Sequence, residues 1–96
     1  MTDARQPLVE RAERFPLKIP LRYLEGGLSE WHEGETVNIS HTGILFEAHK
    51  SLPVNSELDL ELQLAKKTTL SCHGSIVRTQ KSLAAVHIET YNIFRS

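Results

Sequence analysis

Apolar and polar residues alternate along much of this 96-residue chain, and alternation with a period of two is typical of half-buried β-strands. The clearest run covers residues 58–64, where four leucines alternate with acidic or amide side chains. Alternation or a short apolar run predicts six strands, at residues 18–24, 31–39, 44–48, 58–64, 70–79 and 83–88. Short strands at this spacing predict an all-β barrel or sandwich, and closure into a barrel would remove exposed strand edges.

Two of these strands carry features that modify the simple pattern. Pro20 has no N–H to donate, so the first strand is predicted to lie at an edge or to begin irregularly. In residues 31–39, two glutamates share a side with Val37 and Ile39. Only the second half of this strand, through Val37 and Ile39, is therefore predicted to be buried.

The two ends of the chain are predicted to differ from the strands. Residues 1–13 are mostly polar and are predicted to form a flexible N-terminal arm, so that a single barrel domain spans residues 14–96. Residues 91–95 are predicted to form a short C-terminal helical turn, with aromatic side chains that close one end of the barrel.

The composition indicates one small folded domain, because 40% of the residues are apolar and 24% are charged. No apolar run approaches the ~20 residues of a membrane-spanning helix, and residues 1–7 lack the apolar segment of a secretory signal. The single cysteine, Cys72, excludes an intrachain disulfide framework and a zinc site with several cysteines. We therefore expect a cytoplasmic protein.

The net charge of −1 hides an uneven distribution. Residues 1–24 hold five basic and three acidic residues, a net charge of +2, and residues 66–96 hold five basic residues and one acidic residue, a net charge of +4. Residues 25–65 hold one basic and eight acidic residues, a net charge of −7. Most of these charges fit solvated strand faces, and the basic segments could also form a small local anion site. The acidic middle argues against binding of duplex nucleic acid.

The chain offers no recognisable arrangement for catalysis. No two of its five histidines lie at metal-binding spacing, and the adjacent Cys72 and His73 would point to opposite faces of a strand. Cys72 lies in register with Leu70 and Ile76, which predicts a buried thiol beside a solvent-facing imidazole. Because phosphate-binding glycine loops and nucleophile motifs are also missing from the sequence, we expect no catalytic residue, no metal ligand and no enzyme activity.

Residues 38–43, with the sequence Asn-Ile-Ser-His-Thr-Gly, interrupt the strand pattern. Asn38 and Ser40 can hydrogen-bond to the backbone of a turn, and Gly43 can adopt a positive φ or let a ligand approach the backbone. One interpretation is therefore a capped loop between two strands. The other is a polar pocket, in which the Asn38 amide binds a base edge and the Ser40 hydroxyl binds phosphate or base.

Two arginines, Arg11 and Arg14, precede the first predicted strand. Guanidinium groups bind phosphate oxygens and the O6/N7 edge of guanine, and they stack on base planes. Two arginines in a polar arm are also compatible with a segment that only keeps the protein soluble.

Taken together, these residues resemble the PilZ domain, a bacterial receptor module for the second messenger cyclic di-GMP. That family carries an R-x-x-x-R motif just before the first strand and a [D/N]-x-S-x-x-G motif between the second and third strands of a six-stranded barrel. Asn38-x-Ser40-x-x-Gly43 matches the second motif in full. Arg14 and the nine residues that follow it look like the end of the first motif and the first strand.

The resemblance covers nearly the whole chain, from about residue 11 to residue 94, and residues 74–78 look like the fifth strand of the family. It implies an all-β, six-stranded antiparallel barrel that binds cyclic di-GMP and needs no other cofactor. The implied ligand-binding residues are Arg11, Arg14, Asn38, Ser40 and Gly43, with Glu10 and Arg78 as accessory residues. The implied protein partner belongs to a motility, pilus, exopolysaccharide or signalling pathway.

One position departs from the family pattern, because Glu10 stands where the first arginine of R-x-x-x-R belongs. Its carboxylate would approach a dianionic ligand, and a like charge is costly in a poorly hydrated site. Three outcomes are open: Arg11 takes the vacant role, Glu10 accepts the N–H groups of a guanine edge, or ligand binding is lost. In the last case the domain would serve as a protein–protein interaction module.

Overall fold

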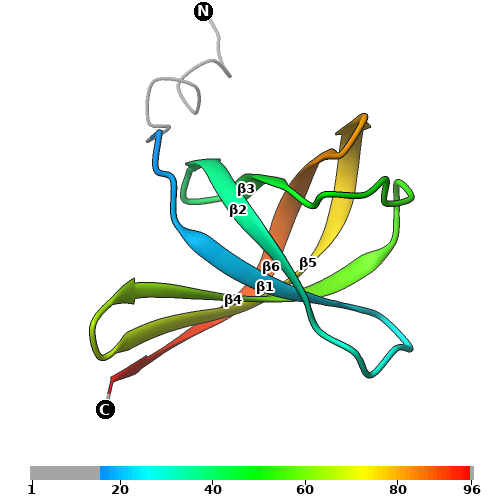
Figure 1. Cartoon of the computed structure of the whole chain (residues 1–96). Helices are drawn as coiled ribbons and strands as arrows, with labels where there is room; N and C mark the ends of the chain where they lie inside the picture. The colour runs from blue at the N-terminus through cyan, green and yellow to red at the C-terminus, as the bar shows by residue number, and fades with distance from the viewer. Residues whose placement is uncertain (1–15, 96) are drawn as a thin grey trace, which may run out of the picture.

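The computed structural model describes residues 16–95, and six antiparallel strands in this range close into a barrel, as Figure 1 shows. The strands are β1 (Pro20–Glu25), β2 (His32–Ile39), β3 (Gly43–Glu47), β4 (Glu57–Ala65), β5 (Thr68–Gln80) and β6 (Leu83–Arg95). Around the barrel they follow the order β1-β2-β3-β6-β5-β4, so the pairs β1–β4 and β3–β6 close the sheet. The predicted six-stranded antiparallel barrel is confirmed.

Side chains that alternate along the strands fill the interior of the barrel. Leu58, Leu60 and Leu62 of β4 are completely buried, as their period-two pattern predicts. They share the core with Tyr23 of β1 and Phe46 of β3, whose ring centroids lie 5.4 Å apart. Because burial of one such leucine contributes roughly 1.5–3 kcal/mol, the alternation determines which face of each strand points inward.

Cys72 belongs to this core, as predicted, and the neighbouring His73 side chain reaches the outer surface. Burial raises the pKa of the Cys72 thiol to about 11. The thiol is therefore protonated at neutral pH and acts as a small apolar side chain rather than as a nucleophile.

The prediction that Val37 is buried is wrong, because a β-bulge interrupts the alternation of β2. Buried Thr36 pairs with Phe46 of β3, and Asn38 pairs with the preceding residue of that strand. Val37 is therefore the extra residue of the bulge, and it is 41% exposed. Ile39 lies beyond the bulge and is partly buried against the core, so the prediction of its burial is confirmed in part.

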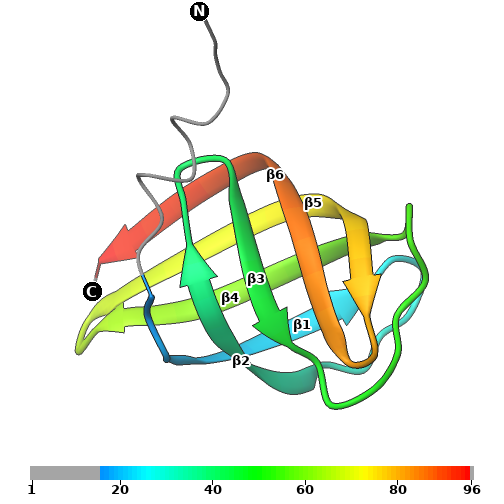
Figure 2. The same ribbon diagram turned by 90° about the horizontal axis from the view of Figure 1, so that it is seen from above.

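The predicted C-terminal helical turn is also wrong, because β6 continues as a strand to Arg95. The neighbouring β5 begins at Thr68, and the two strands pair along their whole length (Figure 2). A helical turn would give up the interstrand hydrogen bonds that this partner offers. Tyr91 and Phe94 are 61% and 59% exposed, so these aromatic side chains do not close the barrel.

The first strand begins at Pro20, and the predicted N-terminal arm precedes the residues that the structure describes. Pro20 is the first residue of β1, which is a position where a strand tolerates a missing N–H, and β1 is paired on both sides. The predicted arm at residues 1–13 lies outside the described residues and stays a prediction.

Between residues 16 and 95, no helix is long and apolar enough to cross a membrane.

Candidate functional site

The polar loop between β2 and β3 is held together by Ser40. The hydroxyl oxygen of Ser40 accepts the backbone N–H groups of Thr42 at 3.3 Å and Gly43 at 3.2 Å. The backbone N–H of Ser40 donates to the carbonyl oxygen of Gly43 at 2.9 Å. Such bonds define a capped turn, so the interpretation of residues 38–43 as a capped loop is confirmed for the backbone.

Gly43 is required by close packing and not by its backbone conformation. The glycine with a positive φ among the described residues is Gly27. A Cβ atom on Gly43 would lie 2.7 Å from the carbonyl oxygen of Val86 in β6, which is closer than side chains come in proteins. The suggestion of a positive φ at Gly43 is therefore wrong, and the backbone that approaches it is that of β6.

Two β-bulges turn Asn38 and Arg78 to the outer face of the barrel. In a regular strand, Asn38 would face inward like the buried Thr36, two residues before it. Arg78 would likewise face inward like the buried Ile76. An extra valine at each bulge, one in β2 and one in β5, reverses both directions.

The strand register aligns these two polar side chains in one row across four strands. Asn38 of β2 pairs with Leu45 of β3, which pairs with Ala85 of β6. Ala85 pairs in turn with Arg78 of β5. Because directly opposite residues of antiparallel strands share a face, the amide of Asn38 and the guanidinium of Arg78 flank an apolar strip on the outer surface.

This row lies in a shallow surface pocket of about 150 Å³. Its lining includes Asn38, Ser40, Gly43, Arg78 and His87. His87, which no sequence pattern predicted as a site residue, lies opposite Gly43 at the start of β3 in the register. The available signal was an exposed imidazole at a polar position of an otherwise apolar strand, and that signal has no specificity alone.

The residues predicted for the site fall into two groups. Those that the structure places together in the pocket are Asn38, Ser40, Gly43 and Arg78. Those that lie outside the described residues are Glu10, Arg11 and Arg14. The way in which the arm meets this pocket therefore stays a prediction.

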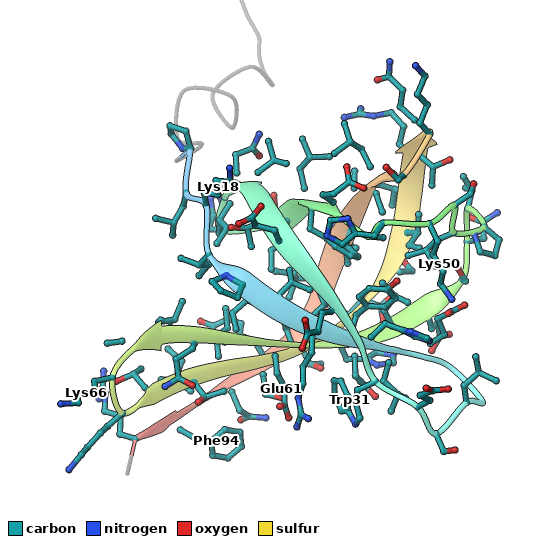
Figure 3. All side chains as sticks on the ribbon, viewed as in Figure 1. Lys18, Trp31, Lys50, Glu61, Lys66 and Phe94 are labelled. Atoms are coloured by element: carbon teal, nitrogen blue, oxygen red, sulfur yellow. The ribbon has the colours of Figure 1, made fainter. Side chains whose placement is uncertain are left out.

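A larger hollow of about 600 Å³ lies on the outer face around Arg22 and Trp31, and it is less suited to an anionic ligand. The guanidinium carbon of Arg22 lies 4.3 Å from the centroid of the Trp31 ring, and a guanidinium nitrogen lies 2.8 Å from a carboxylate oxygen of Glu61. Figure 3 shows Trp31 and Glu61 close together below β1. Because the cation is already paired and Glu33 also lines the hollow, an anion would meet net negative charge.

His73 lies between two carboxylates and not at a metal centre. Its Nδ1 is 2.8 Å from an oxygen of Asp59, and its Nε2 is 3.0 Å from an oxygen of Glu57. The hydrogen bond with Asp59 is the main cause that raises the pKa of His73 above its usual value, and partial desolvation opposes it. In the part of the chain that the structure describes, no group of three His, Cys, Asp or Glu side chains could hold a metal ion.

We expect His73→Gln to remove a pH-dependent contribution to stability. A raised pKa in the folded state means that protonated His73 stabilises the barrel, fully below its unfolded-state pKa of about 6.5 and less as the pH rises through the folded-state value. The free energy of unfolding of the parent should therefore exceed that of the variant most at about pH 5.5 and least at about pH 8.5. Urea unfolding of both proteins across this range measures the difference, and a difference independent of pH would contradict the assignment.

The closed barrel and the capped polar loop between β2 and β3 together define the class of protein. It is a small β-barrel module with its candidate site on the outer surface. The model of the PilZ domain family matches residues 9–93, so this chain belongs to the PilZ domain family. Comparison with curated proteins finds no match. The family is known for binding cyclic di-GMP, and PilZ domains are binding modules rather than enzymes.

Proposed function

We propose that this domain is a receptor for cyclic di-GMP, which binds on the outer face of the barrel at the pocket of Asn38, Ser40 and Arg78. The main support is the pair of β-bulges that aim Asn38 and Arg78 outward in one row. Bulges recur at functional sites because they re-aim a side chain without rebuilding the strand. Neither bulge improves the core, since each leaves a valine in contact with solvent.

The side chains of this row suit a guanine nucleotide. The Asn38 amide combines donors and an acceptor, which fit the edge of a base. The Arg78 guanidinium has five N–H donors in a planar fork, which fit phosphate oxygens or the O6/N7 edge of guanine. Leu45 and Ala85 lie between them and offer an apolar surface to the face of a purine.

The N-terminal arm supplies the second half of the proposed site. Arg11 and Arg14 would bind phosphate or guanine from the side opposite the barrel, and Glu10 or Arg78 would assist. Binding would then fix the arm against the barrel and present a new charged surface to a protein partner. The conformational entropy lost by the arm would be offset by charge-assisted hydrogen bonds and base stacking.

Calorimetric titration of the full chain with cyclic di-GMP tests this proposal. We expect saturable heat at tens of micromolar protein in low salt, and a titration with GMP at the same concentration serves as the matched control. Absence of heat from cyclic di-GMP would reject the receptor function.

The second candidate is a protein–protein interaction module that does not bind cyclic di-GMP. It is favoured by Glu10, which replaces the first arginine of the family motif, and by the exposed Phe94. Trp31 contributes less to an apolar surface, because the guanidinium of Arg22 lies over its ring. The two candidates differ in one measurement, since only the receptor gives heat with cyclic di-GMP.

We expect Ser40→Ala to weaken cyclic di-GMP binding about tenfold, because the loss of its hydroxyl releases the N–H groups of Thr42 and Gly43 and loosens the loop beside Asn38. Ser29→Ala is the matched control, since Ser29 lies in the loop at the other end of β2. The same titration measures both variants. Equal affinity of Ser40→Ala and the parent would remove this loop from the proposed site.

A further inference from the structure

The second half of β6, from residue 89 to residue 95, extends beyond the part of the strand that closes the barrel. β3 pairs with β6 only over Leu83–His87, and the N–H of Ile88 still donates to the carbonyl oxygen of Thr42. Residues 90–95 pair with β5 along one side, and Glu89 is the extra residue of a bulge at the start of this segment. Within residues 16–95, no strand pairs with their other side. Figure 2 shows this end of β6 running past β3 toward the C-terminus.

This free edge carries no charge over residues 90–94 and includes three large apolar or aromatic side chains. Tyr91, Ile93 and Phe94 are 61%, 47% and 59% exposed, and Figure 3 shows Phe94 projecting from the sheet into solvent. Proteins usually protect an edge strand with lysine, proline or a covering segment, because its unpaired N–H and C=O groups bind other strands. An uncharged edge beside exposed aromatic side chains is therefore a surface for strand pairing.

The charges at the two ends of this edge identify the partner. Glu89 stands at one end and Arg95 at the other, six residues apart. An antiparallel copy of the same segment, centred on Asn92, would place each Glu89 opposite an Arg95. A parallel copy in the same register would place like charges opposite each other, which is unfavourable.

We propose that two copies of this domain form a symmetric dimer by antiparallel pairing of residues 89–95 of β6 about a twofold axis at Asn92. The pairing joins the two β5–β6 ribbons into one continuous sheet and makes each contact twice. Tyr91 of one copy lies opposite Ile93 of the other, so apolar side chains meet on one face of the joined sheet.

The proposed dimer leaves the candidate ligand site accessible. Residues 90–95 pair with the Thr68 end of β5, whereas Arg78 lies near the other end of that strand. Each dimer would therefore present two separate pockets. The inference rests on the free edge and its charges, and it does not depend on the binding of cyclic di-GMP.

Sedimentation velocity of the full chain over a range of concentrations tests the dimer. We expect a reversible monomer–dimer equilibrium, because a pairing of seven residues buries a small interface. Arg95→Glu and Glu89→Arg should each weaken the dimer about tenfold or more, since each substitution places two like-charged pairs in the interface. The double variant Glu89→Arg/Arg95→Glu should restore the affinity of the parent. Lys81→Glu makes the same charge change as Arg95→Glu in the β5–β6 turn and should have no effect.

Three results would overturn the proposal. One is a monomer at all concentrations up to roughly 200 µM, where even a weak dimer should form. Another is a dimer whose affinity is unchanged by the single substitutions or is not restored in the double variant. The third is a full chain that stays monomeric while a variant that lacks residues 1–15 dimerises, because the arm of the same copy would then be what covers this edge.

Discussion

Gly74→Ala is expected to destabilise the barrel by about 3 kcal/mol and to lower the melting temperature by roughly 15 °C, without changing which strands form. A Cβ atom on Gly74 would lie 2.2 Å from the carbonyl oxygen of His87 and 2.9 Å from Cγ1 of Val86. The closer atom belongs to the backbone of β6, so it cannot move away as a flexible side chain would. Relief of the overlap requires β5 and β6 to separate next to the bulge between His73 and Gly74.

Gly26→Ala is the matched control for this prediction. A Cβ atom on Gly26 would come no closer than 3.4 Å to the carbonyl oxygen of Glu57, and Gly26 lies in the turn after β1. Thermal and urea unfolding of the parent and both variants measure the effect, and Gly26→Ala should stay within about 1 kcal/mol of the parent. If Gly74→Ala were as stable as Gly26→Ala, the close approach of β6 to β5 would be refuted.

The sequence predicted the barrel best where alternation is unbroken, as along residues 58–62. Leu64 continues the same sequence pattern but is 41% exposed, because a bulge between Gln63 and Ala65 interrupts β4 there. The alternation failed in β2, because the extra residue of a bulge shifts the pattern and Val37 is as apolar as a core residue. Nothing in the side chain of Val37 or Val77 distinguishes a bulged position from a buried one. The position of a bulge depends on the register with the neighbouring strand, which comes from a distant part of the chain.

The C-terminal segment shows a second limit of prediction from sequence. Residues 91–95 are rich in large apolar side chains without a clear period, and such a short segment fits a helical turn or a strand. Here the length of β5 decides the outcome, because it offers pairing partners as far as Arg95. A local pattern does not reveal how far a partner strand extends.

The part of the candidate site that lies in one short stretch of sequence was predictable, and the part that depends on strand pairing was not. Asn38, Ser40 and Gly43 form one short motif, which can be read directly from the sequence. Arg78 and His87 enter the pocket through the pairing of β3 with β6 and of β6 with β5, and this register cannot be read from adjacent residues. The family resemblance indicated Arg78, whereas no pattern indicated His87.

Glu10→Arg is expected to strengthen cyclic di-GMP binding by roughly tenfold to a hundredfold. The substitution restores the R-x-x-x-R spacing to Arg14, removes a carboxylate that would repel a dianion, and adds a guanidinium that can form charge-assisted hydrogen bonds with it. Calorimetric titration of the parent and the variant at the same ionic strength measures the change.

Glu13→Arg separates the restored motif from a general gain of positive charge. It makes the same charge change three residues further along the arm, so electrostatic attraction alone would strengthen binding to a similar extent in both variants. A gain limited to Glu10→Arg means that position 10 contacts the ligand.

If the parent gives no heat and Glu10→Arg does, then the pocket on the barrel is intact and Glu10 alone keeps this PilZ domain from acting as a receptor. Equal affinity of Glu10→Arg and the parent would show that Arg11 already fills the vacant role, or that the arm does not contact the ligand. Arg11→Ala decides between these two, because it weakens binding only in the first case.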